Sequence, residues 1–268
     1  MRIILIRHGD PDYVKDCLTE LGRKEAKELA KRIKKLDPEV YAYYTSPLGR
    51  ARETAEWCLK PLGREAEVLP WIEEFTGRIP DPEDGHLRLG WDLLPQDWMN
   101  DPLCYASGKW WEAGVYRGSN CESAYRRITE GFDALVSGYG YEREKPGEGP
   151  GHCYRTCWGE ENPDKKDGRE ITIVIFCHMI ATFSILSHVT GIAFPVFAHG
   201  FFSAPTGVNV LETEERVPGL AHFRIRAIGD ISHLNAADFP LNDSGFFPGV
   251  GGNAENMMDR ALKETKDR

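Results

Sequence analysis

Residues 2–9 read RIILIRHG, a short apolar run followed at once by an arginine, a histidine and a glycine. An uninterrupted apolar run rich in β-branched residues is typical of a buried strand in an α/β sheet. Because Gly9 lets the backbone turn at low steric cost, Arg7 and His8 are expected at the carboxyl end of that strand, where open α/β sheets bind ligands. A guanidinium fits phosphate oxygens, and a neutral imidazole can attack phosphorus or accept a proton. The alternative is a simple surface pair at a strand end, since short motifs also occur by chance.

The chain as a whole is acidic, and its length suits one large α/β domain or one domain with a sizeable insertion. Its 268 residues contain 33 Lys and Arg against 42 Asp and Glu, which gives a formal charge of −9. This charge argues against nucleic acid or an anionic membrane as a partner, so an anionic substrate must find a local cationic pocket. No apolar run approaches the roughly 20 residues that cross a bilayer.

The seven cysteines are scattered, and the first residues lack the pattern of a signal peptide. Both features predict a cytoplasmic protein with free thiols. The one cluster with metal-binding character is His152, Cys153 and Cys157. It lacks a second ligand pair at zinc spacing, so no metal site is predicted.

The spacing of apolar residues predicts alternating strands and helices after the first strand. Further strands are expected at 40–45, 67–69, 171–176, 208–211 and 222–228, and helices near 19–36, 46–62, 124–136 and 180–190. Thr19 and Ser46 are the expected N-caps of the first two helices, and Asp16 suits the positive end of the first. The run at 171–176, ITIVIF, has the continuous apolar character of a central parallel strand and ends just before Cys177.

Three stretches depart from this alternation. Residues 77–120 are rich in Pro and Trp and are expected to fold as a cap inserted over one end of the sheet. Residues 138–170 are rich in Gly, Pro and charge, which is typical of a long exposed loop. The predicted organisation is one domain over 1–234 that contains the cap and the loop, followed by a C-terminal tail at 235–268.

The cap combines aromatic and basic side chains. Its members are Trp91, Trp98, Trp110 and Trp111, with Arg78, Arg88, Lys109 and Arg117. This mixture suits an organic phosphate with an apolar or ring-shaped body, so the cap is a candidate for substrate selection. The more frequent role for such tryptophans is the small core of the insertion itself.

Five side chains with phosphoryl-transfer chemistry follow predicted strands or open predicted helices. They are Arg7, His8, Arg50, Glu73 and His178. In a parallel sheet these positions share one edge, so the side chains are expected to converge. Cationic groups bind phosphoryl oxygens, a neutral histidine attacks phosphorus, and a carboxylic acid protonates the leaving oxygen. This chemistry requires no metal and no cofactor.

Several segments, taken in order, resemble the histidine phosphatase superfamily, also called the phosphoglycerate mutase-like family. They are IRHG at 6–9, LTELGRKEA at 18–26, TSPLGRARETA at 45–55, EEFTG at 73–77, FCH at 176–178 and IGDISHL at 228–234. These segments frame residues 1–234. The resemblance implies an α/β fold, specifically a three-layer α/β/α sandwich with a mostly parallel central sheet and an inserted cap region.

The resemblance also implies roles for individual residues. His8 would be the phosphorylated nucleophile, and Arg7 and Arg50 would hold the phosphoryl oxygens. His178 would contact the same group and stabilise the transition state. Glu73 would be the proton donor, because it lies four residues before a glycine as the family's acid commonly does, and Glu74 is its rival.

Three departures from the family pattern refine the predicted activity. Met179 follows His178 where glycine is usual, and Asp10 adds a carboxylate near the nucleophile. The stretch 9–18 is shorter than in the mutases, which favours a phosphatase. The prediction is a phosphomonoester hydrolase that forms a phosphohistidine on His8 and acts on a small phosphorylated metabolite. The alternatives are a mutase-type phosphotransferase and a non-catalytic phospholigand-binding module. The sequence specifies neither the natural substrate nor the oligomeric state.

Overall fold

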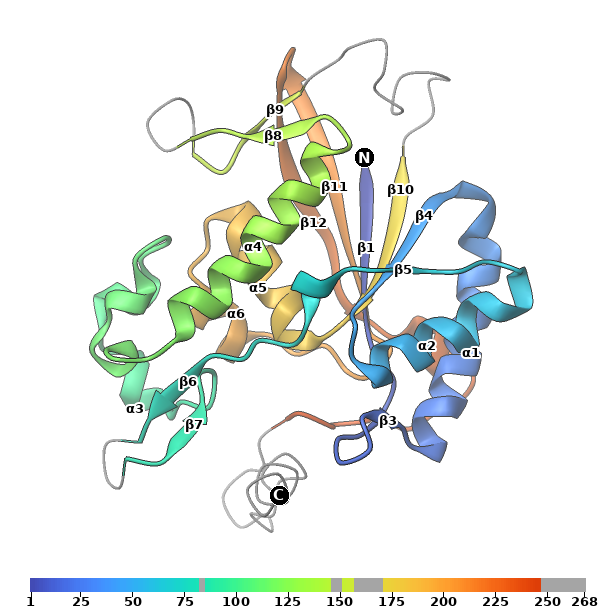
Figure 1. Cartoon of the computed structure of the whole chain (residues 1–268), viewed down its shortest axis with the longest axis horizontal. Coiled ribbons are helices and arrows are strands. Elements are labelled where there is room, and N and C mark those ends of the chain that lie inside the picture. The colour runs from blue at the N-terminus through green and yellow to red at the C-terminus, as the bar shows by residue number, and fades with distance from the viewer. Residues whose placement is uncertain (82–84, 146–150, 157–170, 247–268) are drawn as a thin grey trace.

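An eight-stranded sheet forms the centre of the computed structural model, which describes residues 1–81, 85–145, 151–156 and 171–246. The strand order across the sheet is β5-β4-β10-β1-β11-β12-β9-β8. In that order the strands are Glu67–Val68, Val40–Thr45, Thr172–Cys177, Arg2–Arg7, Val208–Val217, Leu220–Asp230, Tyr154–Thr156 and Tyr141–Arg143. The first strand in the chain, β1, thus lies in the middle of the sheet (Figure 1).

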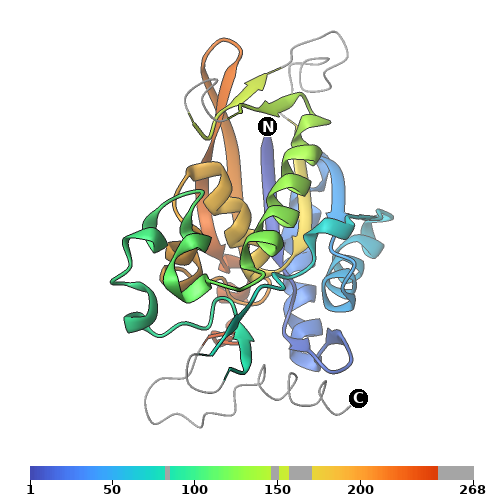
Figure 2. The same cartoon turned by 60° about the vertical axis from the view of Figure 1, so that its left-hand side comes forward.

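The sheet has a parallel half and an antiparallel half. Strands β5, β4, β10 and β1 pair in parallel. From β1 onward the strands β11, β12, β9 and β8 pair antiparallel. The long hairpin of β11 and β12 rises above the remaining strands (Figure 2). The predicted α/β fold class is confirmed, and the carboxyl ends of β1, β10 and β4 share the lower edge in Figure 1.

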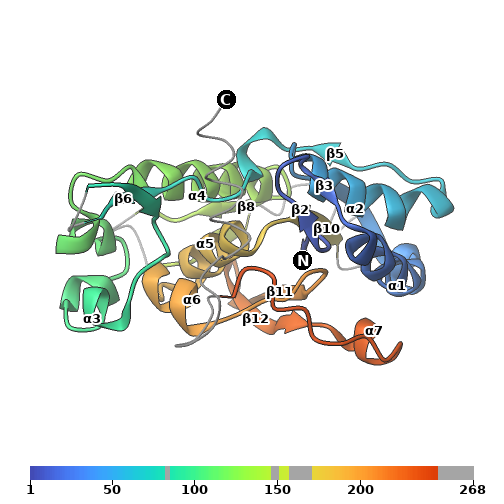
Figure 3. The same cartoon turned by 90° about the horizontal axis from the view of Figure 1, so that it is seen from below.

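Strand alternation explains why helices cover both faces of the sheet. On β1, Ile3 and Leu5 belong to one apolar cluster, whereas Ile4 and Ile6 belong to the other, because successive side chains point to opposite faces. The helices are α1 Glu20–Leu36, α2 Gly49–Leu59, α3 Pro95–Trp98, α4 Cys121–Ser137, α5 Met179–Thr190, α6 Phe194–Gly200 and α7 Ser232–Asn235. Helices α4, α5 and α6 contribute to the first cluster, and α1 and α2 to the second (Figure 3).

Single turns of 3-10 helix lie at η1 Asp37–Glu39, η2 Lys60–Leu62, η3 Pro70–Ile72, η4 Pro102–Tyr105, η5 Trp110–Glu112 and η6 Gly114–Tyr116. Two small antiparallel pairs complete the described secondary structure. They are β2 Pro11–Asp12 with β3 Cys17–Leu18, and β6 Arg78–Pro80 with β7 Leu87–Leu89. No helix in the described ranges is long and apolar enough to cross a membrane.

The two predicted helix caps have different outcomes. Thr19 is the N-cap of α1, and its hydroxyl oxygen accepts a hydrogen bond from the Gly22 N–H. Ser46 does not cap α2, which begins three residues later at Gly49. The Gly49 N–H donates instead to the carboxylate of Asp16 at 2.6 Å. Asp16 therefore accepts a hydrogen bond at the start of α2 and not at the start of α1. It can do so because the turn between β2 and β3 places it beside Gly49.

The stretch that was expected to be a long loop contributes two strands. β8 and β9 lie within residues 138–170 and extend the sheet beyond β12. Cys157 and the other residues of 157–170 lie outside the described ranges, as does the tail from 247 onward. The proposed domain boundaries therefore stay predictions.

The tryptophans of the cap pack into its core. Trp110 is fully buried, and its ring lies 4.8 Å from the rings of both Tyr116 and Phe194, measured between centroids. Trp91 and Trp98 are buried as well. These contacts join the cap to α6, so the packing role accounts for the tryptophans better than a substrate surface does.

Replacing Trp110 by alanine should therefore destabilise the protein strongly. We expect a loss of about 3–5 kcal/mol in the free energy of unfolding, because the change removes a large buried ring and leaves a cavity. Urea denaturation measures this loss. Leu87→Ala is the control, since Leu87 lies in the same cap but is 66% exposed. Equal stability of the two variants would contradict a packed cap core.

Candidate active site

The pairing of β1 with β10 places two histidines side by side. Arg7 lies opposite Cys177 in the register, so His8 and His178 leave the sheet at the same edge. Their ring centroids are 5.2 Å apart. Gly9 matters here for close packing, because a Cβ at this position would lie 2.8 Å from the carbonyl oxygen of Gly22 on α1.

Arg50, in the first turn of α2, completes this group. Its Nε donates to Nε2 of His8 at 3.3 Å. Its Nη1 forms a 2.6 Å ion pair with Oδ1 of Asp16. Because Asp16 also accepts the Gly49 N–H, one carboxylate holds both the start of α2 and the guanidinium. Asp16 was not predicted as a site residue, and nothing in the local sequence links it to Arg50.

The hydrogen bonds of His8 define which ring nitrogen can react. Nδ1 lies 2.7 Å from the carbonyl oxygen of Gly9, which can only accept, so Nδ1 carries the proton. Nε2 then holds the lone pair and faces Arg50. Burial, reinforced by the charges of Arg50 and Arg7, holds the pKa of His8 well below its ordinary value. The ring is therefore neutral, as a nucleophile requires.

His178 is fully buried between the ends of β10 and β4. Its Nε2 lies 2.7 Å from the hydroxyl of Ser46, the residue first expected to cap α2. Burial and the charge of Arg50 also lower the pKa of His178 well below the ordinary value. Its Nδ1 is buried without a hydrogen-bond partner among the described residues.

Arg7 is held by the loop before β11 and by the first residue of α5. Its Nη1 donates to the carbonyl oxygen of Ser203 at 2.7 Å and lies 3.8 Å from the sulfur of Met179. Met179 thus packs against the guanidinium where the family usually has glycine. Nε of Arg7 is buried and has no partner in the described part of the chain. Arg7, His8, Arg50 and His178 are all at most 8% exposed.

The two candidate acids lie in different surroundings. Glu73 forms a 2.8 Å ion pair with Arg127 of α4, and its side chain is 39% exposed. Glu74 turns toward α5, where its Oε1 accepts the N–H groups of Phe75 and Ala181 at 2.8 and 2.9 Å. Burial raises the pKa of Glu74, and the charges of Arg50 and Arg7 act on it in the opposite direction. Glu74 therefore lies within the electrostatic field of the arginines.

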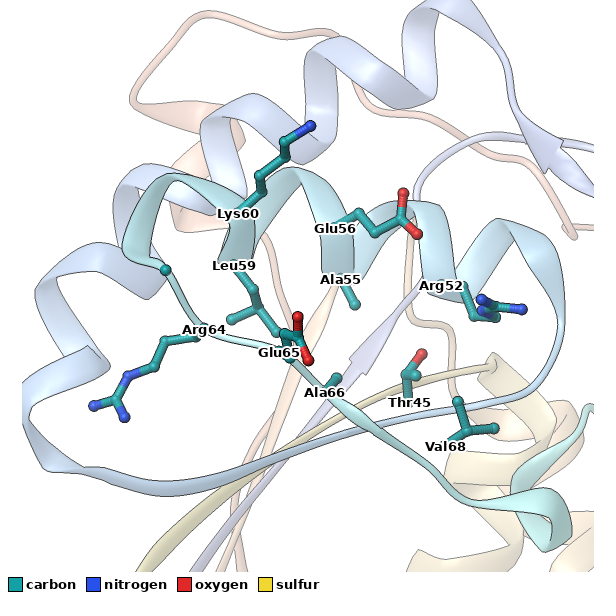
Figure 4. A pocket seen from close by; sticks show the side chains of 11 residues that line it. Thr45, Arg52, Ala55, Glu56, Leu59, Lys60, Arg64, Glu65, Ala66 and Val68 are labelled. Carbon is teal, nitrogen blue, oxygen red and sulfur yellow. The ribbon is translucent and has the colours of Figure 1, made fainter.

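The structure also contains a surface groove that lies apart from these side chains. Arg52, two residues after Arg50, lines a surface groove of about 560 Å³ between α2 and the segment leading to β5 (Figure 4). None of the four convergent side chains borders that groove. Across the residues that the structure describes, no three His, Cys, Asp or Glu side chains are placed to hold a metal ion.

A family model and several solved structures resemble this chain. Residues 3–144 match the model of the histidine phosphatase superfamily (branch 1). No curated protein sequence gives a significant match. Among solved structures, a mutant phosphoserine phosphatase from Entamoeba histolytica in complex with phosphoserine has a TM-score of 0.54 at 17% identity, covering 87% of this chain and 98% of that one. A mycobacterial glucosyl-3-phosphoglycerate phosphatase with inorganic phosphate has a TM-score of 0.55 at 15% identity, with the same coverage of each chain. At sequence identities of 15–17%, the structural similarity establishes that this chain shares their fold.

His8 and His178 should both remain neutral at pH about 6.5, where an ordinary histidine is half protonated. Their depressed pKa values also mean that the unfolded chain binds more protons, so their contribution to stability declines as the pH falls below that value. NMR titration of the imidazole rings measures both sites. A ring that becomes protonated at or above its ordinary pKa would contradict this arrangement.

Proposed function

The chain belongs to the histidine phosphatase superfamily (branch 1), whose model matches more than half of it, and from this premise we propose that it is a phosphomonoester hydrolase that forms a phosphohistidine on His8. The observation that carries the proposal is which ring nitrogen of His8 holds the proton and which holds the lone pair. Its Nδ1 proton is committed to Gly9, so the lone pair on Nε2 is directed into a group of cationic and imidazole side chains.

In the first step, the phosphoryl group of the ester is held by Arg7, Arg50 and His178. The Nε–H of Arg7 supports this binding, because it is buried and has no partner among the described residues. Nδ1 of His178 is buried without a partner there as well, and it is a second donor in the tautomer in which the Ser46 hydroxyl donates to Nε2. Nε2 of His8 attacks phosphorus, and the bond from phosphorus to the ester oxygen breaks. A carboxylic acid protonates that oxygen, which leaves as an alcohol. The guanidinium groups stabilise the charge that spreads over the phosphoryl oxygens.

In the second step, water attacks the phosphohistidine and restores His8. The carboxylate that gave up its proton accepts one from the water, and inorganic phosphate is released. The net reaction consumes one ester and one water and yields one alcohol and one phosphate. Splitting the displacement in this way replaces one difficult step by two easier ones.

We assign the proton transfer to Glu74 in preference to Glu73. The sequence resemblance favours Glu73 by its spacing from Gly77. Glu74 has the more suitable surroundings, because burial raises its pKa and its carboxylate accepts the N–H of Ala181 in the first turn of α5. Glu73 is already engaged by Arg127.

Two other functions use the same side chains. A mutase would transfer the phosphoryl group to a second alcohol in place of water, and the short stretch 9–18 favours the hydrolase. A non-catalytic module would bind phosphate without turnover. The structural neighbours are named for phosphoserine and glucosyl-3-phosphoglycerate, so small phosphorylated metabolites of this kind are the first substrates to screen. The cytoplasmic location stays a prediction.

Wild-type protein should hydrolyse p-nitrophenyl phosphate in the presence of EDTA, and His8→Ala should lower the rate about a thousandfold or more, since it removes the nucleophile. Circular dichroism checks that the fold survives. His222→Ala is the matched control, because His222 is exposed on β12 and takes no part in the site. Phosphate binding without turnover by the wild type would favour the non-catalytic module.

Glu74→Gln should slow hydrolysis of alkyl phosphates about a hundredfold or more, and of activated aryl phosphates much less, because an aryl leaving group needs little protonation. Glu73→Gln should affect both substrate types equally. The measurement is kcat/KM for each variant on both ester classes. A selective loss in Glu73→Gln with none in Glu74→Gln would return the role to Glu73.

A further inference from the structure

The described part of the C-terminal tail crosses the edge of the sheet that holds the candidate active site. After α7 the chain runs back beneath the carboxyl end of β1, along the lower side of the molecule in Figure 1 and across the view in Figure 3. We call residues 240–246 the strap. Its contacts reach Asp10, Glu25 and Arg7, which lie more than 200 residues earlier in the chain.

Asn242 attaches the strap to a pair of carboxylates beside the nucleophile. Its Nδ2 donates to Oε1 of Glu25 at 2.7 Å and to Oδ1 of Asp10 at 3.1 Å. Its Oδ1 accepts the N–H of Ser244, which fixes the orientation of the amide. Thr19 donates to the other oxygen of Asp10 at 2.6 Å. Carboxylate oxygens accept hydrogen bonds, so the Asn242 amide N–H group is a suitable donor between them.

Gly245 brings the strap into contact with Arg7. A Cβ at this position would lie 2.9 Å from Nη2 of the guanidinium, and the backbone φ of +88° also suits glycine. Nη1 of Arg7 is held on another side by the carbonyl oxygen of Ser203. The guanidinium is thus confined at both terminal nitrogens, while Nε has no partner in the described structure.

The strap has few other attachments within the described residues. Leu241 is 63% exposed and Phe246 is 60% exposed. The ring of Phe246 meets the edge of Phe202 at a centroid distance of 5.2 Å. Since so little apolar surface is buried, the hydrogen bonds of Asn242 supply much of what holds this segment in place.

We propose that Asn242 is a positioning residue, which fastens the strap to Asp10 and Glu25 and so keeps Gly245 against Arg7. The strap then holds the guanidinium with Nε directed to the phosphoryl group. This inference rests on the proposed function, because it assumes that Arg7 binds phosphate. It assigns the C-terminal segment to the phosphate site, although no strap residue reacts with the substrate.

Asn242→Ala and Gly245→Ala in the full-length protein test the proposal. Isothermal titration calorimetry with inorganic phosphate should show a dissociation constant raised about tenfold in each, and KM for p-nitrophenyl phosphate should rise by more than kcat falls, as expected when ground-state binding is lost. Gly245→Ala leaves the Asn242 hydrogen bonds in place but forces a methyl group toward Arg7. It therefore tests the same contact even if Asn242→Ala fails to fold.

Leu241→Ala is the control, because this exposed side chain is in the strap but contacts neither carboxylate, and its phosphate affinity should match the wild type. Unchanged or tighter phosphate binding in Gly245→Ala, or in a folded Asn242→Ala, would overturn the positioning role while leaving the proposed function intact. A wild-type protein that binds no phosphate would overturn both.

Discussion

The parallel pairing of β1 with β10 is the constraint on which the site depends. It sets Arg7 opposite Cys177, so the residue after each strand is a histidine and the two rings meet at one edge. A shift of one residue in this register would turn every apolar side chain of β1 toward the wrong face. The packing of the two apolar clusters therefore fixes this register, and the register fixes where the two histidines lie. The same pairing thus stabilises the fold and positions the histidines.

Burial then sets the charge state of that edge. Two guanidinium groups and two imidazoles lie together with little access to water, so burial and the positive charges lower the pKa of both histidines. Among the described residues, the only negative charge in direct contact with Arg50 is Asp16, and Arg7 contacts the uncharged sulfur of Met179. Under the proposed function, a dianionic phosphoryl group would compensate this local excess of positive charge, although the protein as a whole is acidic.

The sequence predicts best what depends on neighbours in the chain. The strand before Arg7, the strand before His178 and the Thr19 cap follow from local pattern, and they place the two histidines correctly. The contacts of Asp16 and Asn242 could not be predicted, because they join residues 34 to 232 positions apart through the tertiary fold. The strands β8 and β9 have only three residues each, too few for a recognisable pattern, and they are strands because β9 pairs with β12 and β8 pairs with β9. Glu73 and Glu74 are adjacent, so only the direction of each side chain distinguishes them.

The central place of β1 has a consequence for how the protein is made. Residues 2–7 are synthesised long before their partners in the sheet, which are residues 172–177 and 208–212. Until those partners emerge, the apolar residues 3–6 of this strand have neither neighbouring strand, and a loop of more than 160 residues must close before β1 pairs with β10. Co-translational folding can therefore not complete the sheet early. Contacts so distant along the chain predict slow folding, and the unpaired strand must be kept from aggregating in the nascent chain. The same topology means that a fragment ending before residue 172 lacks β10 and therefore cannot bring the two histidines together.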